Sequence, residues 1–175
     1  FPDEWIIYGN HHDAWVNGAQ DPTSGAVAVL ETARGLGTLV KNGWKPHRTI
    51  VFALWDGEEW GLLGSTEWAE KHGAELKQKA VAYINSDSNG KGWLGAGGSH
   101  SLQQLVNEVA RDVNDPRTSA PVLNEARAQA IKATPDAEKQ EAESDPSLRI
   151  APLGSGSDYT AFLQHLTIAS LNIGY

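Results

Sequence analysis

Three short apolar segments constrain the fold of this 175-residue chain more than any other feature. They cover residues 5–8, 48–55 and 80–85. Near-continuous apolar runs of this length are typical of strands that are buried on both faces of a parallel sheet. Between and after them lie segments with apolar residues at helical spacing, at residues 24–40, 65–71 and 101–113. The alternation predicts an α/β fold of three layers, with a mostly parallel, mixed sheet between helices.

The second half of the chain extends this pattern. Residues 166–172 predict a fourth strand, and residues 154–158 predict a turn that leads into a helix ending near His165. Residues 114–147 are rich in alanine and charged residues and contain four prolines. We expect a helical excursion over the sheet that could act as a lid, inside a single domain of residues 1–175.

Composition excludes several functional classes. The chain has 14 basic and 22 acidic residues, a net charge of −8, which argues against a nucleic-acid partner because phosphates require a basic face. Without cysteine there is neither a disulfide nor a thiolate site. The chain contains no run of about 18 apolar residues, so the sequence predicts no membrane span. The chain also lacks methionine and begins at Phe1, so we expect a piece of a longer protein.

Polar side chains follow each of the three predicted strands. His11 comes directly after the first, Glu58 and Glu59 follow the second, and Asp87 follows the third. The carboxyl ends of parallel strands meet at one edge of a sheet, where ligands bind. Carboxylates together with an imidazole suit zinc. One of the adjacent glutamates could then bind metal while the other takes a proton from an activated water.

Each of these motifs also has a purely structural interpretation. His11 could lie in an exposed polar loop, and the two glutamates could form the acidic first turn of a helix. Asp21 precedes Pro22, which suits turn and cap chemistry, although an X-Pro bond also tolerates the cis form, which could aim both carboxylate oxygens at two metals. Asp13, two residues after His11, could fix the imidazole tautomer. Their joint placement after three successive strands favours a site.

Longer motifs carry a family resemblance. Residues 9–15 (GNHHDAW), 21–26 (DPTSGA), 55–70 (WDGEEWGLLGSTEWAE), 83–87 (YINSD) and 153–159 (LGSGSDY) resemble the peptidase domain of the glutamate carboxypeptidase II-like, co-catalytic di-zinc aminopeptidase family. The motifs occur in family order and cover nearly the whole chain, least well at residues 114–147. The resemblance implies a zinc-dependent exopeptidase with a peptide substrate, secreted or periplasmic. The alternative is a transferrin-receptor-like binding domain that has the fold without catalysis.

The resemblance also implies roles for individual residues. His11 and Asp87 would hold one zinc, Glu59 would hold a second, and Asp21 would bridge them. Glu58 would be the general base and acid for the bridging water, and Asp13 would orient His11. Four residues would line the substrate site: Ser155, Gly156, Ser157 and Asp158. Two others, Glu67 and Glu70, would hold a structural calcium.

The chain also departs from the family pattern. The histidine that completes the second zinc site in the family lies beyond Tyr175, so one zinc or none is expected here. Residues 171–175 lack the arginines of the glutamate-specific members, so a preference for acidic side chains is not supported. The family's outer strands are absent, so we expect weak or no activity of residues 1–175 alone and self-association through an uncovered sheet edge.

Overall fold

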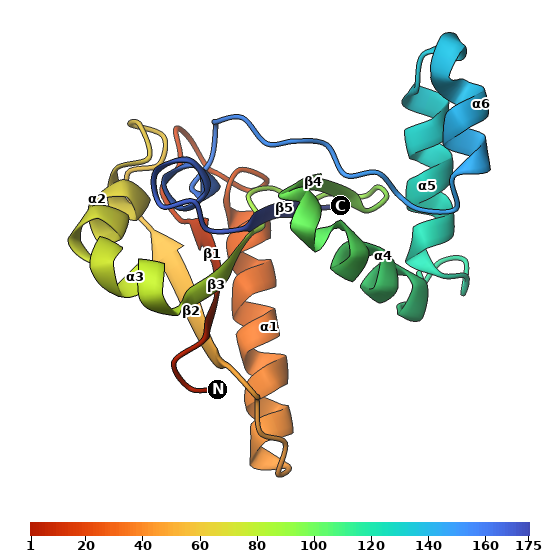
Figure 1. Cartoon of the computed structure of the whole chain (residues 1–175). Helices are drawn as coiled ribbons and strands as arrows, with labels where there is room; N and C mark the ends of the chain where they lie inside the picture. Colours follow the sequence, from red (N-terminus) through yellow and green to blue (C-terminus); the bar gives the residue numbers. More distant parts are fainter.

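The computed structural model describes residues 1–175 and contains a five-stranded sheet between helices (Figure 1). The strand order is β2-β1-β3-β5-β4; β2, β1, β3 and β5 run parallel to one another, and β4 is antiparallel to β5. This mixed sheet confirms the predicted α/β class. The strands are β1 (Trp5–His11), β2 (Thr49–Trp55), β3 (Ala80–Asn85), β4 (Gly95–Gly98) and β5 (Ser170–Gly174).

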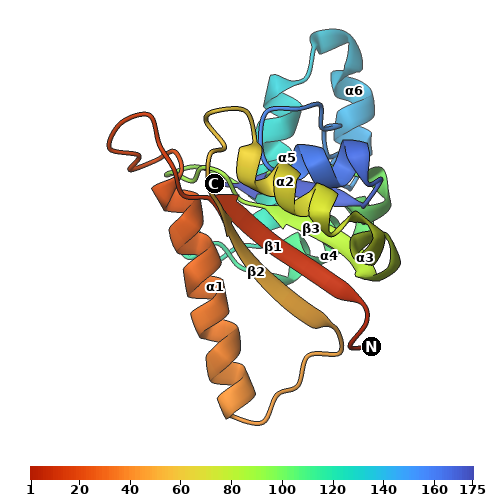
Figure 2. The ribbon, with the colours of Figure 1, turned by 90° about the vertical axis from the view of Figure 1, so that its left-hand side faces the viewer.

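Helices cover both faces of the sheet, as predicted. On one face lie α1 (Thr23–Lys41) and, towards β5 and β4, α4 (Gln103–Asp112). The opposite face carries α2 (Leu63–Lys71), α3 (Gly73–Lys79) and the π-helical turn η2 (Ala161–His165) (Figure 2). None of the helices combines the length and apolar character that crossing a membrane requires.

The main hydrophobic core lies between the sheet and the layer of α2, α3 and η2. Ile7 and Tyr83 from the central strands are fully buried there, together with Leu76 of α3. The ring of Tyr83 stacks on Phe162 of η2, with ring centroids 4.1 Å apart. This core explains why the central apolar segments form strands: each side chain that faces it is removed from water.

The face that carries α1 and α4 is covered less completely. Between α4 and strands β3 and β5 a groove of about 280 Å³ is lined only by apolar residues, and Leu105 and Val109 of α4 are about half exposed beside it. Strand β2 is an outer strand, with one backbone edge that no other strand of the chain pairs. Self-association through this edge stays a prediction.

Three local expectations differ from the structure. The fourth predicted strand begins only at Ser170, because Thr167 has a left-handed backbone (φ 57°) and Leu166 and Ile168 are buried in the main core next to η2. Strand β4 was not predicted because its sequence, Gly-Ala-Gly-Gly, has low strand propensity and pairs only through tertiary contacts. Helix α3 was also missed; it follows α2 after only one residue, His72.

The insertion at residues 114–147 is helical, as expected, but it does not lie over the middle of the sheet. It forms a pair of helices, α5 (Val122–Ala133) and α6 (Asp136–Ser144), that projects beyond the sheet next to α4 (Figure 1). Val122, Leu123 and Ala126 of α5 share a second buried cluster with α4. A lid function for this pair stays a prediction.

A single glycine allows α1 to approach the loop after β3. A Cβ atom on the buried Gly25 would lie 1.8 Å from the backbone oxygen of Ser86 and 2.1 Å from that of Asp87. Only a residue without a side chain therefore fits between the start of α1 and this loop. A Cβ atom on Gly35 or Gly37 of the same helix would have no neighbouring atom within 4 Å.

We predict that Gly25→Ala lowers the free energy of unfolding by about 1–3 kcal/mol, the range for overpacking a filled site. Gly35→Ala and Gly37→Ala are matched controls in the same helix and should each raise it by about 0.5–1 kcal/mol. Urea unfolding followed by circular dichroism measures all three. Equal effects of the three substitutions would contradict the close approach of α1 to residues 86 and 87.

Candidate metal centre

The carboxyl ends of β1, β2 and β3 meet around one buried imidazole. His11 ends β1 and is 1% exposed. Its Nε2 atom lies 3.3 Å from Asp21 Oδ1, 3.3 Å from Asp87 Oδ1 and 3.9 Å from Glu58 Oε2. His11, Glu58 and Asp87 form a group whose ligand atoms all lie within 4.8 Å of one another, so they could hold a metal ion. The parallel strands thus bring His11 and Glu58, which are 47 positions apart in the sequence, together with Asp87, which lies 29 positions after Glu58.

Electrostatics in this group favour a positive charge at the imidazole. Burial alone lowers the pKa of His11, but the hydrogen bond to Asp87 and the charges of Asp87 and Glu58 outweigh it and raise the pKa to about 9. Burial raises the pKa of Asp87, yet its hydrogen bonds to His11 and Ser157 hold that pKa below the ordinary value. A site with this field attracts a cation.

Asp13 fastens the loop after β1 to the loop after β2. Its carboxylate accepts hydrogen bonds from the backbone N–H groups of Glu58 (3.0 Å) and Glu59 (3.2 Å). Burial raises the pKa of Asp13, but these two donors outweigh it and keep the pKa below its usual range. Asp13 also orients the imidazole, because His11 Nδ1 lies 3.1 Å from the Asp13 backbone oxygen and its Nε2 atom therefore faces the carboxylates.

The two adjacent glutamates point to different surroundings. Glu58 faces His11, and burial, reinforced by the negative charges of Asp158, Asp87 and Glu59, raises its pKa to about 7 in spite of the imidazole nearby. Glu59 Oε1 instead accepts a hydrogen bond from the backbone N–H of Trp15, at 3.3 Å. The structure therefore places the expected base, rather than the expected ligand Glu59, in the group around His11.

Two further contacts position the remaining loops, and sequence reasoning missed them. The fully buried Asn10 donates from its Nδ2 atom to the backbone oxygens of Pro22 (3.0 Å) and Asp87 (3.1 Å). One side chain of β1 thus holds the segments that carry Asp21 and Asp87. The Asp21–Pro22 bond is cis, the form that the sequence analysis considered. A polar residue inside an apolar strand was the available signal for Asn10.

A buried chain of hydrogen bonds runs from the core to Asp87. Trp55 Nε1 donates to the Tyr83 hydroxyl (3.0 Å), which donates to Asn85 Oδ1 (3.0 Å). Asn85 Nδ2 donates to the Ser157 hydroxyl (2.9 Å), which in turn donates to Asp87. Tyr83 and Asn85 lie two residues apart on β3, so both point to the same face of the sheet. The chain fixes the orientation of the Asp87 carboxylate.

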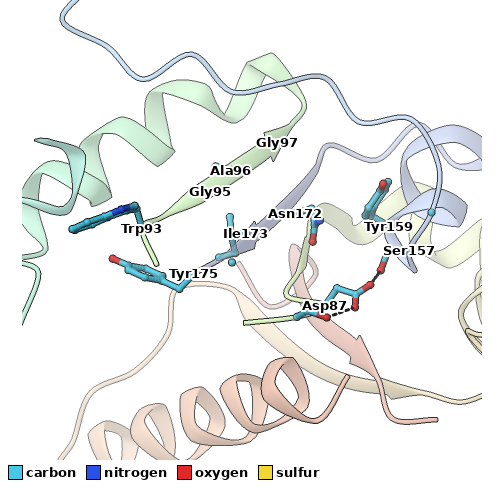
Figure 3. A pocket seen from close by; sticks show the side chains of 13 residues that line it. Asp87, Trp93, Gly95, Ala96, Gly97, Ser157, Tyr159, Asn172, Ile173 and Tyr175 are labelled. Atoms are coloured by element: carbon cyan, nitrogen blue, oxygen red, sulfur yellow. Dashed lines mark hydrogen bonds between the residues drawn. The ribbon is translucent and has the colours of Figure 1, made fainter. Parts of the chain in front are cut away.

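A cavity of about 450 Å³ opens beside Asp87 (Figure 3). Of the expected substrate-lining residues, Gly156 and Ser157 line it, whereas Ser155 is exposed and does not. Asp158 is fully buried and is not part of the lining either; neither of its carboxylate oxygens has a hydrogen-bond partner, and burial raises its pKa to about 6. Uncharged side chains that line the cavity were not predicted: Trp93, Tyr159, Asn172, Ile173 and Tyr175.

The residues expected to hold calcium lie elsewhere. Glu67 and Glu70 are exposed on α2, and neither belongs to a group of three or more side chains that could hold a metal. None of the other five histidines joins the group around His11.

The fold and the site together define an α/β domain with a candidate metal centre at the carboxyl ends of its parallel strands. The chain belongs to peptidase family M28, whose sequence pattern matches residues 2–173. It is 40% identical over 181 residues to the mouse (Mus musculus) protein named aminopeptidase NAALADL1, and 38% identical over 177 residues to the maize (Zea mays) protein named probable glutamate carboxypeptidase VP8. Each alignment covers 99% of this chain but 23% of the relative, so the chain spans about a quarter of the length of these curated relatives.

Solved structures show the same fold. BSAP, a zinc aminopeptidase from Bacillus subtilis, aligns with a TM-score of 0.60 and 22% identity, over 98% of this chain and 36% of that chain. An aminopeptidase from Aneurinibacillus sp. strain AM-1 aligns with a TM-score of 0.61 and 23% identity, over 98% of this chain and 35% of that chain. The family expected from the sequence motifs and the three-layer fold are thus confirmed.

We predict that Asp13→Ala increases hydrogen exchange at the amides of Glu58 and Glu59 by roughly tenfold or more, because each loses a bond to a charged acceptor worth about 1.5–3 kcal/mol. Mass spectrometry with fragmentation measures this. Asp112→Ala, which removes an exposed carboxylate at the end of α4, is the control and should leave both amides unchanged. Unchanged exchange in Asp13→Ala would show that the loop after β2 is held in another way.

Proposed function

We propose that this chain is the metal-binding region of a zinc-dependent exopeptidase. The observation that carries the proposal is the position of His11 Nε2, within 4 Å of carboxylate oxygens of Asp21, Glu58 and Asp87, next to a cavity large enough for a side chain. The donor set fits zinc, which accepts imidazole nitrogen and carboxylate oxygen. The names of the relatives, an aminopeptidase and a probable glutamate carboxypeptidase, support cleavage from a chain terminus.

Within this proposal the residues have separate roles. His11 and Asp87 would hold one zinc, Glu59 would hold a second, and Asp21 would serve as a ligand shared by both. Zinc, when bound, supplies a Lewis acid that polarises the scissile carbonyl and acidifies water. Asp13 and Asn10 keep the ligand-bearing loops in register through their backbone hydrogen bonds. Ser157 and Asn85 hold the Asp87 carboxylate in one orientation.

Glu58 is the proton carrier of the proposed reaction. A carboxylate beside the metal-binding group can accept a proton from water and return it to a leaving group. Its carboxylate takes the proton from the attacking water and delivers it to the amine that leaves. This role requires a carboxylate next to the proposed metal ligands, and Glu58 Oε2 lies 3.9 Å from His11 Nε2.

The roles of the two glutamates can be separated by isosteric substitution. We predict that Glu58→Gln retains zinc binding while kcat falls by roughly 10²–10⁴-fold, the usual contribution of a general base. Glu59→Gln should instead weaken zinc binding. Calorimetry measures zinc affinity and stoichiometry, and hydrolysis of aminoacyl and peptidyl substrates gives kcat, both on the longest form of the protein that can be produced.

Each outcome of this comparison is informative. Loss of zinc binding in Glu58→Gln with retention in Glu59→Gln would exchange the two roles. A wild-type chain that binds no zinc would contradict the proposed function and favour the binding-domain alternative. We expect His11→Ala to abolish tight zinc binding. His100→Ala, the control, changes a histidine outside the site and should leave zinc binding intact.

The cavity beside Asp87 also allows a prediction about the substrate. Asp87 is its only charged lining residue, and Arg117, which lies over the ring of Trp93, is paired with Asp115 at 2.7 Å. A glutamate side chain would therefore enter without a cationic partner. We predict that substrates with leucine or glutamine at the position held by this cavity are cleaved at least roughly tenfold more efficiently than those with glutamate, because the Asp87 carboxylate repels a second negative charge.

Glutamine is the matched comparison for this test, since it differs from glutamate in charge and hardly in shape. Competition between paired substrates gives the ratio of kcat/KM values directly. A preference for glutamate over glutamine would contradict this assignment of the cavity while leaving the metal centre untouched.

A further inference from the structure

Two tryptophans form an exposed aromatic pair at the candidate metal centre. Trp15 is 60% exposed and Trp60 is 71% exposed, and their ring centroids lie 4.8 Å apart at an interplanar angle of 52°. Large aromatic side chains are usually well buried, and an exposed apolar cluster beside polar groups marks an interaction site. Neither ring has a role in the metal centre or in the hydrophobic core described above.

The pair lies on the side of the metal centre opposite the cavity. Trp15 is in the loop after β1 and Trp60 is in the loop after β2, and both loops leave the same end of the sheet (Figure 2). Trp60 directly follows Glu59, and the backbone N–H of Trp15 donates to Glu59 Oε1. The cavity is lined from β4, β5, the loop after β3 and the segment before η2. Because β2 and β5 lie on opposite sides of β1 and β3, the two features flank His11.

We propose that Trp15 and Trp60 form a second substrate contact that takes an apolar or aromatic side chain of the peptide. This inference rests on the proposed function and deepens it. A peptide whose scissile bond lies at Glu58 and His11 extends to both sides of them. The cavity receives the residue on one side of that bond, and the tryptophan pair receives the residue on the other. Indole faces offer a large apolar contact area and bind aromatic rings edge-to-face or offset-stacked.

The pair is not needed to hold the two loops together. Asp13 already fastens the loops through its bonds to the Glu58 and Glu59 amides, and the His12 amide donates to the Trp55 backbone oxygen at 2.9 Å. Contact between the rings also leaves more than half of each side chain exposed. The exposed ring surface is therefore available to a ligand at the position where a substrate would pass.

NMR titration of the zinc-loaded chain tests the proposal. The protein carries Glu58→Gln to prevent hydrolysis, and the ligands are the dipeptides Gly-Gly, Phe-Gly and Gly-Phe. Phenylalanine at one of the two positions should bind through the tryptophan pair, and phenylalanine at the other should bind through the cavity. The indole N–H signals of Trp15 and Trp60, assigned by substitution among the seven tryptophans, should shift with only one of the two phenylalanine dipeptides.

Trp15→Ala and Trp60→Ala should each reduce the gain in affinity from that one phenylalanine by roughly two- to tenfold, the range for an aromatic contact. The gain at the other position should remain. Both substitutions keep the backbone N–H groups, so the Trp15 bond to Glu59 survives. Trp44→Ala is the control, because Trp44 is also partly exposed (40%) but lies between α1 and β2 at the opposite end of the sheet.

The remaining outcomes contradict the proposal. If the gains at both positions fall together with zinc affinity, the pair only supports the loops. If neither gain changes, or if a chain that binds zinc binds none of the dipeptides, the pair is not a substrate contact, and the metal centre stands. Failure to bind zinc at all would instead show that the proposed function is wrong.

Discussion

His11 is buried at the end of β1, the strand that has β2 on one side and β3 on the other, and the arrangement of the site depends on it. Its Nδ1 atom is held by Asp13, so its Nε2 atom faces the carboxylates of Asp21, Glu58 and Asp87. Each of these carboxylates comes from a different loop. The imidazole is therefore the common partner of three segments that are far apart in the sequence, and its orientation determines which oxygens can act together.

Carboxylates at this density repel one another, and the structure offsets the repulsion with directed donors. Asp13 accepts two backbone N–H groups, and Asp87 accepts from Ser157 and contacts the imidazole. Glu58 and the unpartnered, fully buried Asp158 have no comparable donors, and burial raises the pKa of both. A bound cation would relieve the same repulsion, which is the physical link between this cluster and metal binding.

The supports of the site are built from backbone contacts as well as side chains. Asn10 bonds two backbone oxygens, Asp13 bonds two backbone amides, and Gly25 lets α1 pass close to residues 86 and 87. Such contacts fix the loops before any ligand arrives, so less ordering remains for binding to complete. The exposed surfaces next to this rigid centre, the cavity beside Asp87 and the rings of Trp15 and Trp60, can then differ in chemistry without disturbing it.

Local patterns along the chain were sufficient to predict the class of fold and the order of the loops that carry the candidate ligands. Continuous apolar runs predicted buried strands, and polar residues directly after them predicted where the chemistry lies, because both signals are local in the chain. The family motifs identified His11, Asp21, Glu58, Glu59 and Asp87 as candidates.

How these residues are supported, and which of the two adjacent glutamates faces the histidine, became visible in the three-dimensional arrangement. The bonds of Asn10, the chain from Trp55 to Asp87 and the approach of Gly25 each join segments distant in sequence, so no local pattern encodes them. The same holds for β4, whose glycine-rich sequence becomes a strand only by pairing with β5, and for the insertion, which packs on α4 rather than over the sheet. Local propensity specifies elements, whereas burial and pairing between distant segments specify where those elements place their side chains.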